Sequence, residues 1–314
     1  MPNPVLNHPR FHDEQAAYDW IEAIVWADGR VCPHCGVVDD SGKLQGKTTR
    51  IGLYKCYACR KPFTVKIGTI FEDSHAPLNV WLQAMYMLCS SKKGFSTNQL
   101  ARALGVHLKT AWHMSHRIRL AMDGSSGSGP IGGAGKIVEA DETFITKSPK
   151  TRRKVGERAD VQVLSLVERG GPLRSVFLDH GTVRPALYRH FDFKSRLYTD
   201  GAQHYVKLLP VGQHESVDHS KEEWVRKLPD GTKVHTNTLE GFFSIFKRGM
   251  VGVYQHCSEA HLHRYLAEFD FRYNNRVANG ISDEERTDRA IRGIVGKRLT
   301  YRETVNATKA KTAR

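Results

Sequence analysis

The chain has 314 residues, a formal net charge of +14 at pH 7 and a sequence pI near 9.5. Its length suffices for about two domains, and the Lys and Arg residues spread along it favour a polyanion such as nucleic acid over a small acidic substrate. No apolar run approaches the roughly 18 residues of a membrane span, and residues 1–14 hold no hydrophobic signal core, so we expect a cytoplasmic protein with no membrane partner.

The first predicted element is a short amphipathic helix within residues 13–26. Ala17, Trp20, Ile21 and Ile24 recur at helical spacing behind an acidic first turn. We therefore assign residues 1–29 to an N-terminal helical segment that leads into the next module.

Four of the six cysteines form two pairs with the same internal spacing. Cys32 and Cys35 make the first CxxC pair, and Cys56 and Cys59 make the second after twenty intervening residues. Four thiolates on two tight turns complete a tetrahedron around one Zn²⁺ ion, and so small a module needs the metal in order to fold. The spacing predicts a zinc ribbon over residues 30–66 with one structural zinc ion. Two redox CxxC motifs or a disulfide framework are the alternatives, which a reducing compartment disfavours.

Residues 76–123 are predicted to be helical and to include a helix-turn-helix. Residues 78–89 are apolar enough for a core helix, and two shorter helical stretches lie on either side of Gly105. In the DNA-binding form of this motif the second helix presents polar side chains to the DNA. An ordinary three-helix packing unit with a solvated charged face is the alternative. The candidate DNA contacts are Lys109, Thr110, His113 and Arg117.

Residues 124–135 hold six glycines, three serines and one proline in twelve positions, which predicts a flexible linker. Residues 136–280 follow as a second domain of the α/β class. Three strands in a meander, a helix, a fourth strand and then more helices give the order of the ribonuclease H fold. The predicted strands are 136–145, 161–168, 173–179 and 196–200, with a basic loop at 147–153 and the first helix at 182–191.

Three acids fall where this second domain would bring them together. Asp141 lies within a predicted strand, Asp200 closes the strand at 196–200, and Glu240 opens a helix that starts near residue 236. Strand ends at the carboxyl edge are where α/β sheets place their sites, and three carboxylates suit a divalent metal. Lys247 returns to nearly the same helix face seven residues after Glu240, so one face carries both a metal ligand and a phosphate contact.

Each acid also has a structural interpretation. Asn237 and Glu240 fit a helix N-capping box, and Asp200 with Gly201 is a common turn. The rivals of Asp141 are Glu139 on the same strand face, Glu142 on the opposite face and Asp179 at a strand end. His219 and Asn237 are predicted to lie close to the site, although a residue such as His219 is more often a satisfied polar side chain.

The chain resembles insertion-sequence transposases of the zinc-ribbon, DDE-domain kind, the ISXO-like group, from about residue 11 to residue 276. In this group the last acidic position is sometimes Asn, and a Lys follows it by seven residues; Glu240 and Lys247 occupy those positions here. The matching blocks are Cys-Pro-His-Cys-Gly at 32–36, Val-Glu-Ala-Asp-Glu at 138–142, Tyr-Thr-Asp-Gly at 198–201, the run 235–248, and residues 264–269 and 271–276.

The resemblance implies a DDE transposase with a catalytic domain of the RNase H-like type in a prokaryotic, nucleoid-associated setting. Asp141, Asp200 and Glu240 would hold two Mg²⁺ or Mn²⁺ ions, and Lys247 and Arg248 would contact DNA. The implied partners are double-stranded DNA, as terminal inverted repeats and as target, and a second copy of the chain, since synapsis pairs two ends. A non-catalytic zinc-dependent DNA-binding regulator and an RNase H-like nuclease or resolvase are the alternative functions. Residues 281–314 match nothing and are predicted to be a basic tail.

Overall fold

The computed structural model describes residues 4–124, 129–146, 160–178, 182–206, 208–210, 212–255 and 257–300. The chain divides into two compact units, one formed by residues 1–123 with 276–314 and the other by residues 124–275. The predicted basic loop at 147–153 and Asp179 lie outside the described residues. None of the helices in the described ranges is long and apolar enough to cross a membrane.

The cysteine module in the first unit is a small antiparallel sheet. Its strands are β1 (Ser41–Lys43), β2 (Tyr54–Cys56) and β3 (Pro62–Phe63), in that spatial order. The buried core beneath them consists of Cys32, Tyr54, Cys56 and Phe63. Because two of these four side chains belong to the CxxC pairs, apolar burial by itself gives the module little stability.

The rest of the first unit is helical, and one of its helices comes from the far end of the sequence. Arg286 and Ile291 of that helix are buried, and the Arg286 guanidinium donates to the Cys89 carbonyl at 2.8 Å. The prediction of a tail from residue 281 is therefore wrong for this stretch. The helices are α1 (Glu14–Val25), α2 (Leu78–Ser90), α3 (Thr97–Leu104), α4 (Leu108–Met122) and α8 (Asp283–Arg292), and α2 packs against each of the others.

The predicted linker is structured in its second half. The Ile131 side chain is 3% exposed, and its backbone N–H donates to the His190 carbonyl at 2.7 Å. Gly132 has a φ of +111°, and a Cβ there would lie 2.1 Å from the Ser195 Oγ, so this position requires glycine. The flexible-linker prediction is therefore wrong from Ile131 onward, where the chain already belongs to the second unit.

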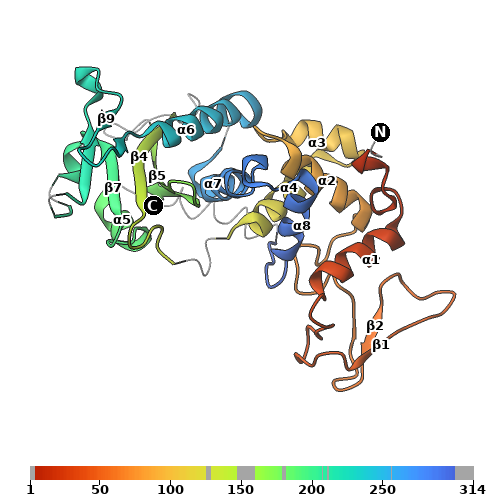
Figure 1. The fold of residues 1–314 in the computed structure, drawn as a ribbon. Helices are drawn as coiled ribbons and strands as arrows, with labels where there is room; N and C mark the ends of the chain where they lie inside the picture. The colour runs from red at the N-terminus through yellow and green to blue at the C-terminus, as the bar shows by residue number, and fades with distance from the viewer. Residues whose placement is uncertain are drawn as a thin grey trace, which may run out of the picture. The chain divides into compact units, whose positions relative to one another are not determined.

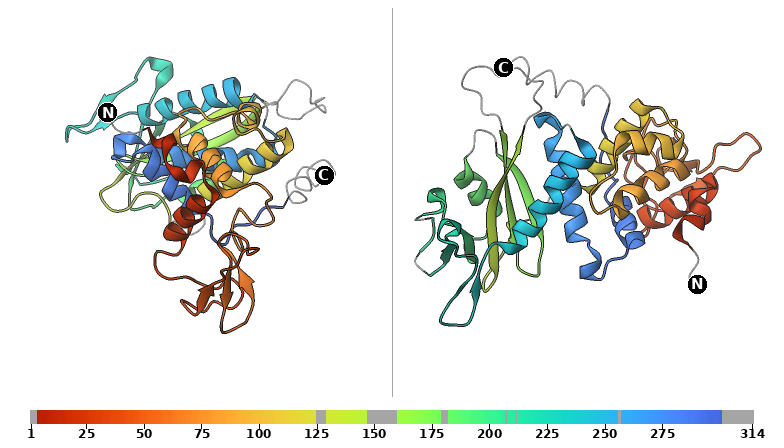
Figure 2. Two further views of the ribbon diagram at one scale, coloured as in Figure 1. Left: turned by 90° about the vertical axis from the view of Figure 1, so that its right-hand side faces the viewer. Right: turned by 90° about the horizontal axis from the view of Figure 1, so that it is seen from above.

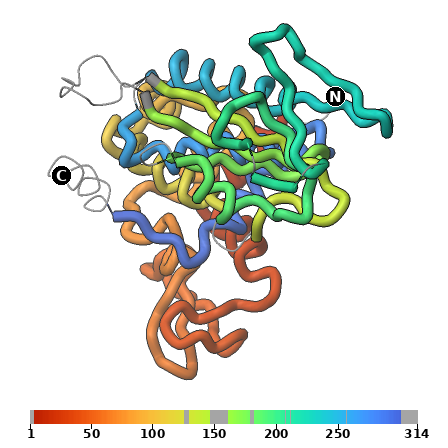
Figure 3. The backbone as a smooth tube through the Cα atoms, turned by 90° about the vertical axis from the view of Figure 1, so that its left-hand side faces the viewer, coloured from red at the N-terminus to blue at the C-terminus, as the bar shows by residue number. Residues whose placement is uncertain are grey.

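The second unit is built on a five-stranded mixed sheet in the order β6-β5-β4-β7-β8 (Figure 1). The first three strands in sequence pair antiparallel, while β7 is parallel to both β4 and β8. A short hairpin of β9 and β10 lies beside β8 and extends away from the sheet (Figures 1 and 3). The strands are β4 (Ile137–Thr146), β5 (Asp160–Glu168), β6 (Leu173–Leu178), β7 (Arg196–Asp200), β8 (His214–Val217), β9 (Arg226–Lys227) and β10 (Lys233–Val234).

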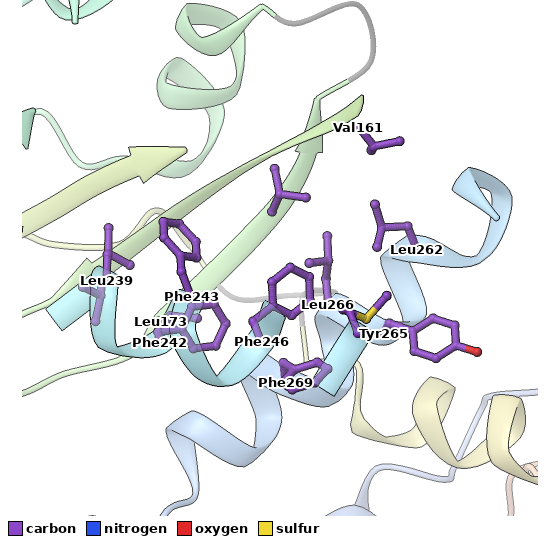
Figure 4. Packing of buried hydrophobic residues seen from close by; sticks show 13 residues of the cluster. Val161, Leu173, Leu239, Phe242, Phe243, Phe246, Leu262, Tyr265, Leu266 and Phe269 are labelled. Atoms are coloured by element: carbon purple, nitrogen blue, oxygen red, sulfur yellow. The ribbon is translucent and has the colours of Figure 1, made fainter. Parts of the chain in front are cut away.

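Helices cover both faces of this sheet (Figure 2). On one face α6 (Asn237–Gly249) and α7 (Glu259–Asn274) bury phenylalanines and leucines against β5 and β6, as Figure 4 shows. On the other face α5 (Val183–His190) packs over a second apolar cluster that includes Ile131 and Leu164. The sheet is therefore covered on both faces. The carboxyl ends of its parallel strands β4, β7 and β8 lie along one edge, where polar side chains gather.

Candidate active site and zinc centre

The four cysteines of the ribbon converge on one point. Their sulfur atoms all lie within 4.8 Å of one another, and the Cys32–Cys59 and Cys35–Cys56 sulfurs are each 3.7 Å apart. Four sulfurs about 2.3 Å from a tetrahedral Zn²⁺ ion stand about 3.75 Å apart, whereas a disulfide needs about 2.05 Å. The residues present therefore fit a structural zinc ion, and the geometry excludes disulfide pairing of these four thiols.

The register of the sheet brings Asp141 and Asp200 together. Strands β4 and β7 run parallel, with Glu139 opposite Tyr198. Two residues further along each strand stand Asp141 and Asp200, and side chains two apart on a strand share a face. Asp200 is the last residue of β7, and its Oδ1 accepts from the Ala202 N–H at 3.2 Å.

Glu240 reaches this edge from the first turn of α6. Thr236 precedes the helix without making a side-chain capping bond, and its Oγ1 donates to Glu240 Oε1 at 3.1 Å. Asn237 is the first helical residue and does not cap, so the alternative of an Asn237 capping box is wrong. His219, just beyond β8, places its Nε2 atom 3.6 Å from Glu240 Oε1 and 3.4 Å from Thr236 Oγ1. The predicted position of His219 close to the site is therefore beside Glu240.

Asp141 has the most perturbed environment of these acids. Burial, followed by the negative charge of Asp200, raises the pKa of Asp141 to about 7. The carboxylates of Glu142 and Glu240 add to the rise, while the N–H of Glu142, which donates to Asp141 Oδ1 at 2.7 Å, opposes it. Because burial and the neighbouring carboxylates destabilise the negative charge of Asp141, a cation bound here would be stabilising.

Two rival acids on β4 have partners of their own. Glu139 is fully buried and accepts from Arg169 Nε at 2.8 Å and from Thr238 Oγ1 at 2.9 Å. Glu142 accepts from the Tyr205 hydroxyl and lies 3.0 Å from His204 Nε2. Asp141 lies between them, and within the described part of the chain its carboxylate forms no ion pair and accepts a hydrogen bond from the backbone N–H of Glu142.

The carboxylates stand further apart than the sulfurs do. Within the described residues, the four cysteines are the one group of three or more Cys, His, Asp or Glu side chains whose ligand atoms all lie within 4.8 Å. Asp141, Asp200 and Glu240 are close enough for the charges of the other two to raise the pKa of Asp141. The acids therefore share an edge of the sheet without forming a closed cage.

This charge balance makes stability depend on pH, and we expect Asp141→Asn to stabilise the fold when no cation other than zinc is present. The pKa of Asp141 is about 7 in the folded protein against an ordinary 3.8, so between those values only the folded state keeps the proton. Stability therefore falls as pH rises across this window, and Asn removes that loss, on the order of 4 kcal/mol at pH 8 for a shift of about three pKa units.

Urea unfolding of the zinc-loaded protein at pH 5.5 and pH 8 measures the effect, because zinc binding to the thiolates weakens at lower pH. The gain from Asp141→Asn is expected to be clearly larger at pH 8 than at pH 5.5. The exposed Asp230, whose pKa is lowered by the Thr232 N–H and by Arg196, provides Asp230→Asn as a control that gives no gain at pH 8. An equal gain for Asp141→Asn at both pH values would contradict this account of the site.

The predicted DNA contacts in the helical region are placed unequally. Helices α3 and α4 are joined at Gly105, which has a left-handed φ of 65°. Lys109 and Thr110 are exposed and His113 is half-buried. Arg117 is buried, and its guanidinium donates to the carbonyl oxygens of Ile70, Glu72 and Leu299, so the prediction that it faces DNA is wrong.

The basic pair at the end of α6 is exposed. Lys247 lies in the last turn of the helix, seven residues after Glu240. Arg248 hydrogen-bonds to the Ser244 carbonyl and hydroxyl of its own helix, which fixes the direction of its guanidinium along the helix surface.

The structure thus combines a module that fits a structural zinc ion with an α/β unit that carries acids along one edge of its sheet. Residues 132–274 match the ISXO2-like transposase domain, and residues 12–62 match the transposase zinc-ribbon domain. A protein of Halobacterium salinarum described as an uncharacterized protein in transposable element ISH50 is 26% identical over 285 residues, which cover 83% of this chain and 91% of that protein. The two domain matches and this relative indicate an insertion-sequence transposase.

Proposed function

We propose that this transposase cleaves and joins DNA at the ends of its insertion sequence, using Asp141, Asp200 and Glu240. The observation that carries the proposal is the position of the half-buried Asp141 carboxyl, whose pKa is raised by desolvation and then by the charges of Asp200 and Glu240 from two other elements. Such convergence of like charges from β4, β7 and α6 is costly unless a divalent cation offsets it. The sheet order β6-β5-β4-β7-β8, antiparallel and then parallel, supports an RNase H-like assignment for this unit.

The residues divide the chemistry among them. When bound, a pair of Mg²⁺ or Mn²⁺ ions would supply the positive charge that activates the attacking hydroxyl and stabilises the leaving oxygen. Asp141 on the central strand β4, Asp200 on β7 and Glu240 on α6 would hold these ions. Lys247 is exposed on the helix that carries Glu240 and would bind a phosphate of the DNA strand that is cleaved.

The reaction would be two displacements at phosphorus. In the first, a water oxygen bonds to the phosphorus at the element's end, the bond to the 3′ oxygen breaks, and that oxygen leaves as a 3′-hydroxyl. In the second, this 3′-hydroxyl loses its proton and attacks a target phosphodiester, whose own 3′ oxygen leaves and takes up a proton. No covalent protein intermediate is required, because both steps use an oxygen of water or DNA as nucleophile.

We infer that the first unit recognises the terminal inverted repeats. The zinc ribbon and the exposed Lys109 and Thr110 of α4 are the surfaces proposed for this role, and the charge of +14 supports a DNA partner. Joining requires two ends in one complex, so a dimer or a higher assembly of this chain is the proposed active form.

The test is cutting and joining of a supercoiled plasmid that carries both ends of the element. Nicks at the ends and joined products are expected with Mg²⁺ or Mn²⁺, with none in the presence of excess chelator or on a plasmid lacking the ends. Binding of the ends without any cut would instead indicate a DNA-binding regulator. Structure-selective cutting without joining would indicate a nuclease or resolvase.

A further inference from the structure

Glu139 is a fully buried carboxylate that links the strand bearing Asp141 to the helix bearing Glu240. Besides the Arg169 and Thr238 side chains, it accepts from the Thr238 backbone N–H at 3.1 Å. The His235 Nδ1 atom lies 3.4 Å away. Thr238 is the second residue of α6, so a charge on β4 satisfies one of the N–H groups that a helix N-terminus leaves open.

Arg169 extends this link to the segment that leads into the helix. Its two terminal nitrogens donate to the carbonyl oxygens of Lys233 and His235, at 2.6 and 3.1 Å. Its guanidinium also lies over the Tyr198 ring of β7, 4.8 Å from the centroid. Through Glu139 and Arg169, one ion pair therefore contacts β4, β7 and α6. These three elements carry Asp141, Asp200 and Glu240.

The spacing of these contacts ties them to the acids. Glu139 and Asp141 are two residues apart on one strand and share its face. Thr238 and Glu240 are two residues apart on the helix, a rise of about 3 Å. Each end of the Glu139–Thr238 bond is thus two residues from a proposed ligand, so a shift at this bond changes the separation of Asp141 and Glu240.

A buried ion pair is a poor source of net stability, because desolvation offsets much of the attraction between its charges. Its directional hydrogen bonds do fix geometry, and groups that orient the side chains around a metal ion affect the affinity for that ion. We propose that Glu139 and Arg169 are positioning residues that set the separation of Asp141 and Glu240 for divalent-cation binding. This inference rests on the proposed function and removes Glu139 from the candidate ligands.

Mn²⁺ binding to the zinc-loaded full chain, measured by electron paramagnetic resonance without DNA, tests this role. Glu139→Gln keeps the side-chain shape but loses the charge opposite Arg169. We expect it to weaken Mn²⁺ binding by about tenfold or more. The matched control is Glu268→Gln, which neutralises another fully buried carboxylate in the same unit, paired with Arg272 on α7. The control is expected to lose stability and to keep the wild-type Mn²⁺ affinity.

Thr238→Val provides a second variant should Glu139→Gln not fold. It removes the Oγ1 donor and retains the backbone donor, so we expect a smaller weakening of Mn²⁺ binding in the same direction. Wild-type affinity in Glu139→Gln or, where that variant is unfolded, in Thr238→Val overturns the positioning role alone. Equal weakening in Glu268→Gln also overturns it, since the effect would then follow from general destabilisation. A wild-type protein that binds no Mn²⁺ at Asp141, judged against Asp141→Asn, overturns the proposed function itself.

Discussion

Asp141→Asn is expected to lower strand cleavage at the element's end by about a thousandfold or more, with repeat binding left near the wild-type level. Asn has nearly the shape of Asp and keeps an oxygen for the N–H of Glu142, so the strand should be undisturbed. What it loses is the central negative charge among Asp200 and Glu240. The surfaces proposed to bind the repeat lie in the other compact unit, which this substitution does not touch.

The measurement pairs two assays on one preparation: single-turnover cleavage of a labelled end, and a gel-shift titration of the inverted repeat. Asp230→Asn is the matched control, because it makes the same chemical change at an exposed ion pair with Arg196 in the same unit. It should cut normally. Cleavage by Asp141→Asn at more than about a tenth of the wild-type rate would rule out its carboxylate as the central ligand.

Strands β4, β5, β6 and β7 could be predicted from the sequence because each is a local pattern, whereas the short strands β8, β9 and β10 were missed. Runs of β-branched and apolar residues gave the strands near 137–146, 160–168 and 196–200 to within a residue or so. The convergence of four sulfurs was equally accessible, since two CxxC turns allow few other arrangements. In both cases neighbouring residues carry the information.

Arg117 shows what such patterns cannot supply. Helical periodicity correctly placed it on one face with Lys109 and His113, but it does not say which end of that face is covered. The carbonyls that bind its guanidinium lie 47 and 182 residues away in the chain, at Ile70 and Leu299. Only the packing of those segments decides that Arg117 is structural while Lys109 faces solvent.

The choice among the acids of β4 has the same origin. Strand alternation allowed Glu139 or Asp141 to be the site carboxylate, because both lie on one face. Arg169, thirty residues on, and Thr238, ninety-nine residues on, decide between them by binding Glu139. The helix α8 escaped prediction for a related reason, since its sequence is mostly charged and its buried Arg286 finds its carbonyl partner 197 residues away.

Removal of zinc is expected to unfold residues 30–66 and to reduce repeat binding by about a hundredfold or more, because metal binding supplies most of the folding free energy of such a module. Cys56 is fully buried, and the small core around it contains only Tyr54, Phe63 and another ligand, Cys32, as its other buried members. The strands are two or three residues long. Without the metal, this amount of apolar burial cannot offset the entropy of ordering the chain.

Cys56→Ser should therefore lose zinc, expose the segment between the CxxC pairs to protease and abolish repeat binding. The second unit has its own two apolar clusters, so its Mn²⁺ affinity should stay unchanged. Cys257→Ser, in that second unit, is the control and should retain one zinc per chain. Should Cys56→Ser stay protease-resistant and bind the repeat as before, the four sulfurs would have to be held by packing alone. That outcome would be incompatible with a metal-dependent ribbon, because the core described here is too small to hold two pairs of thiols 3.7 Å apart unaided.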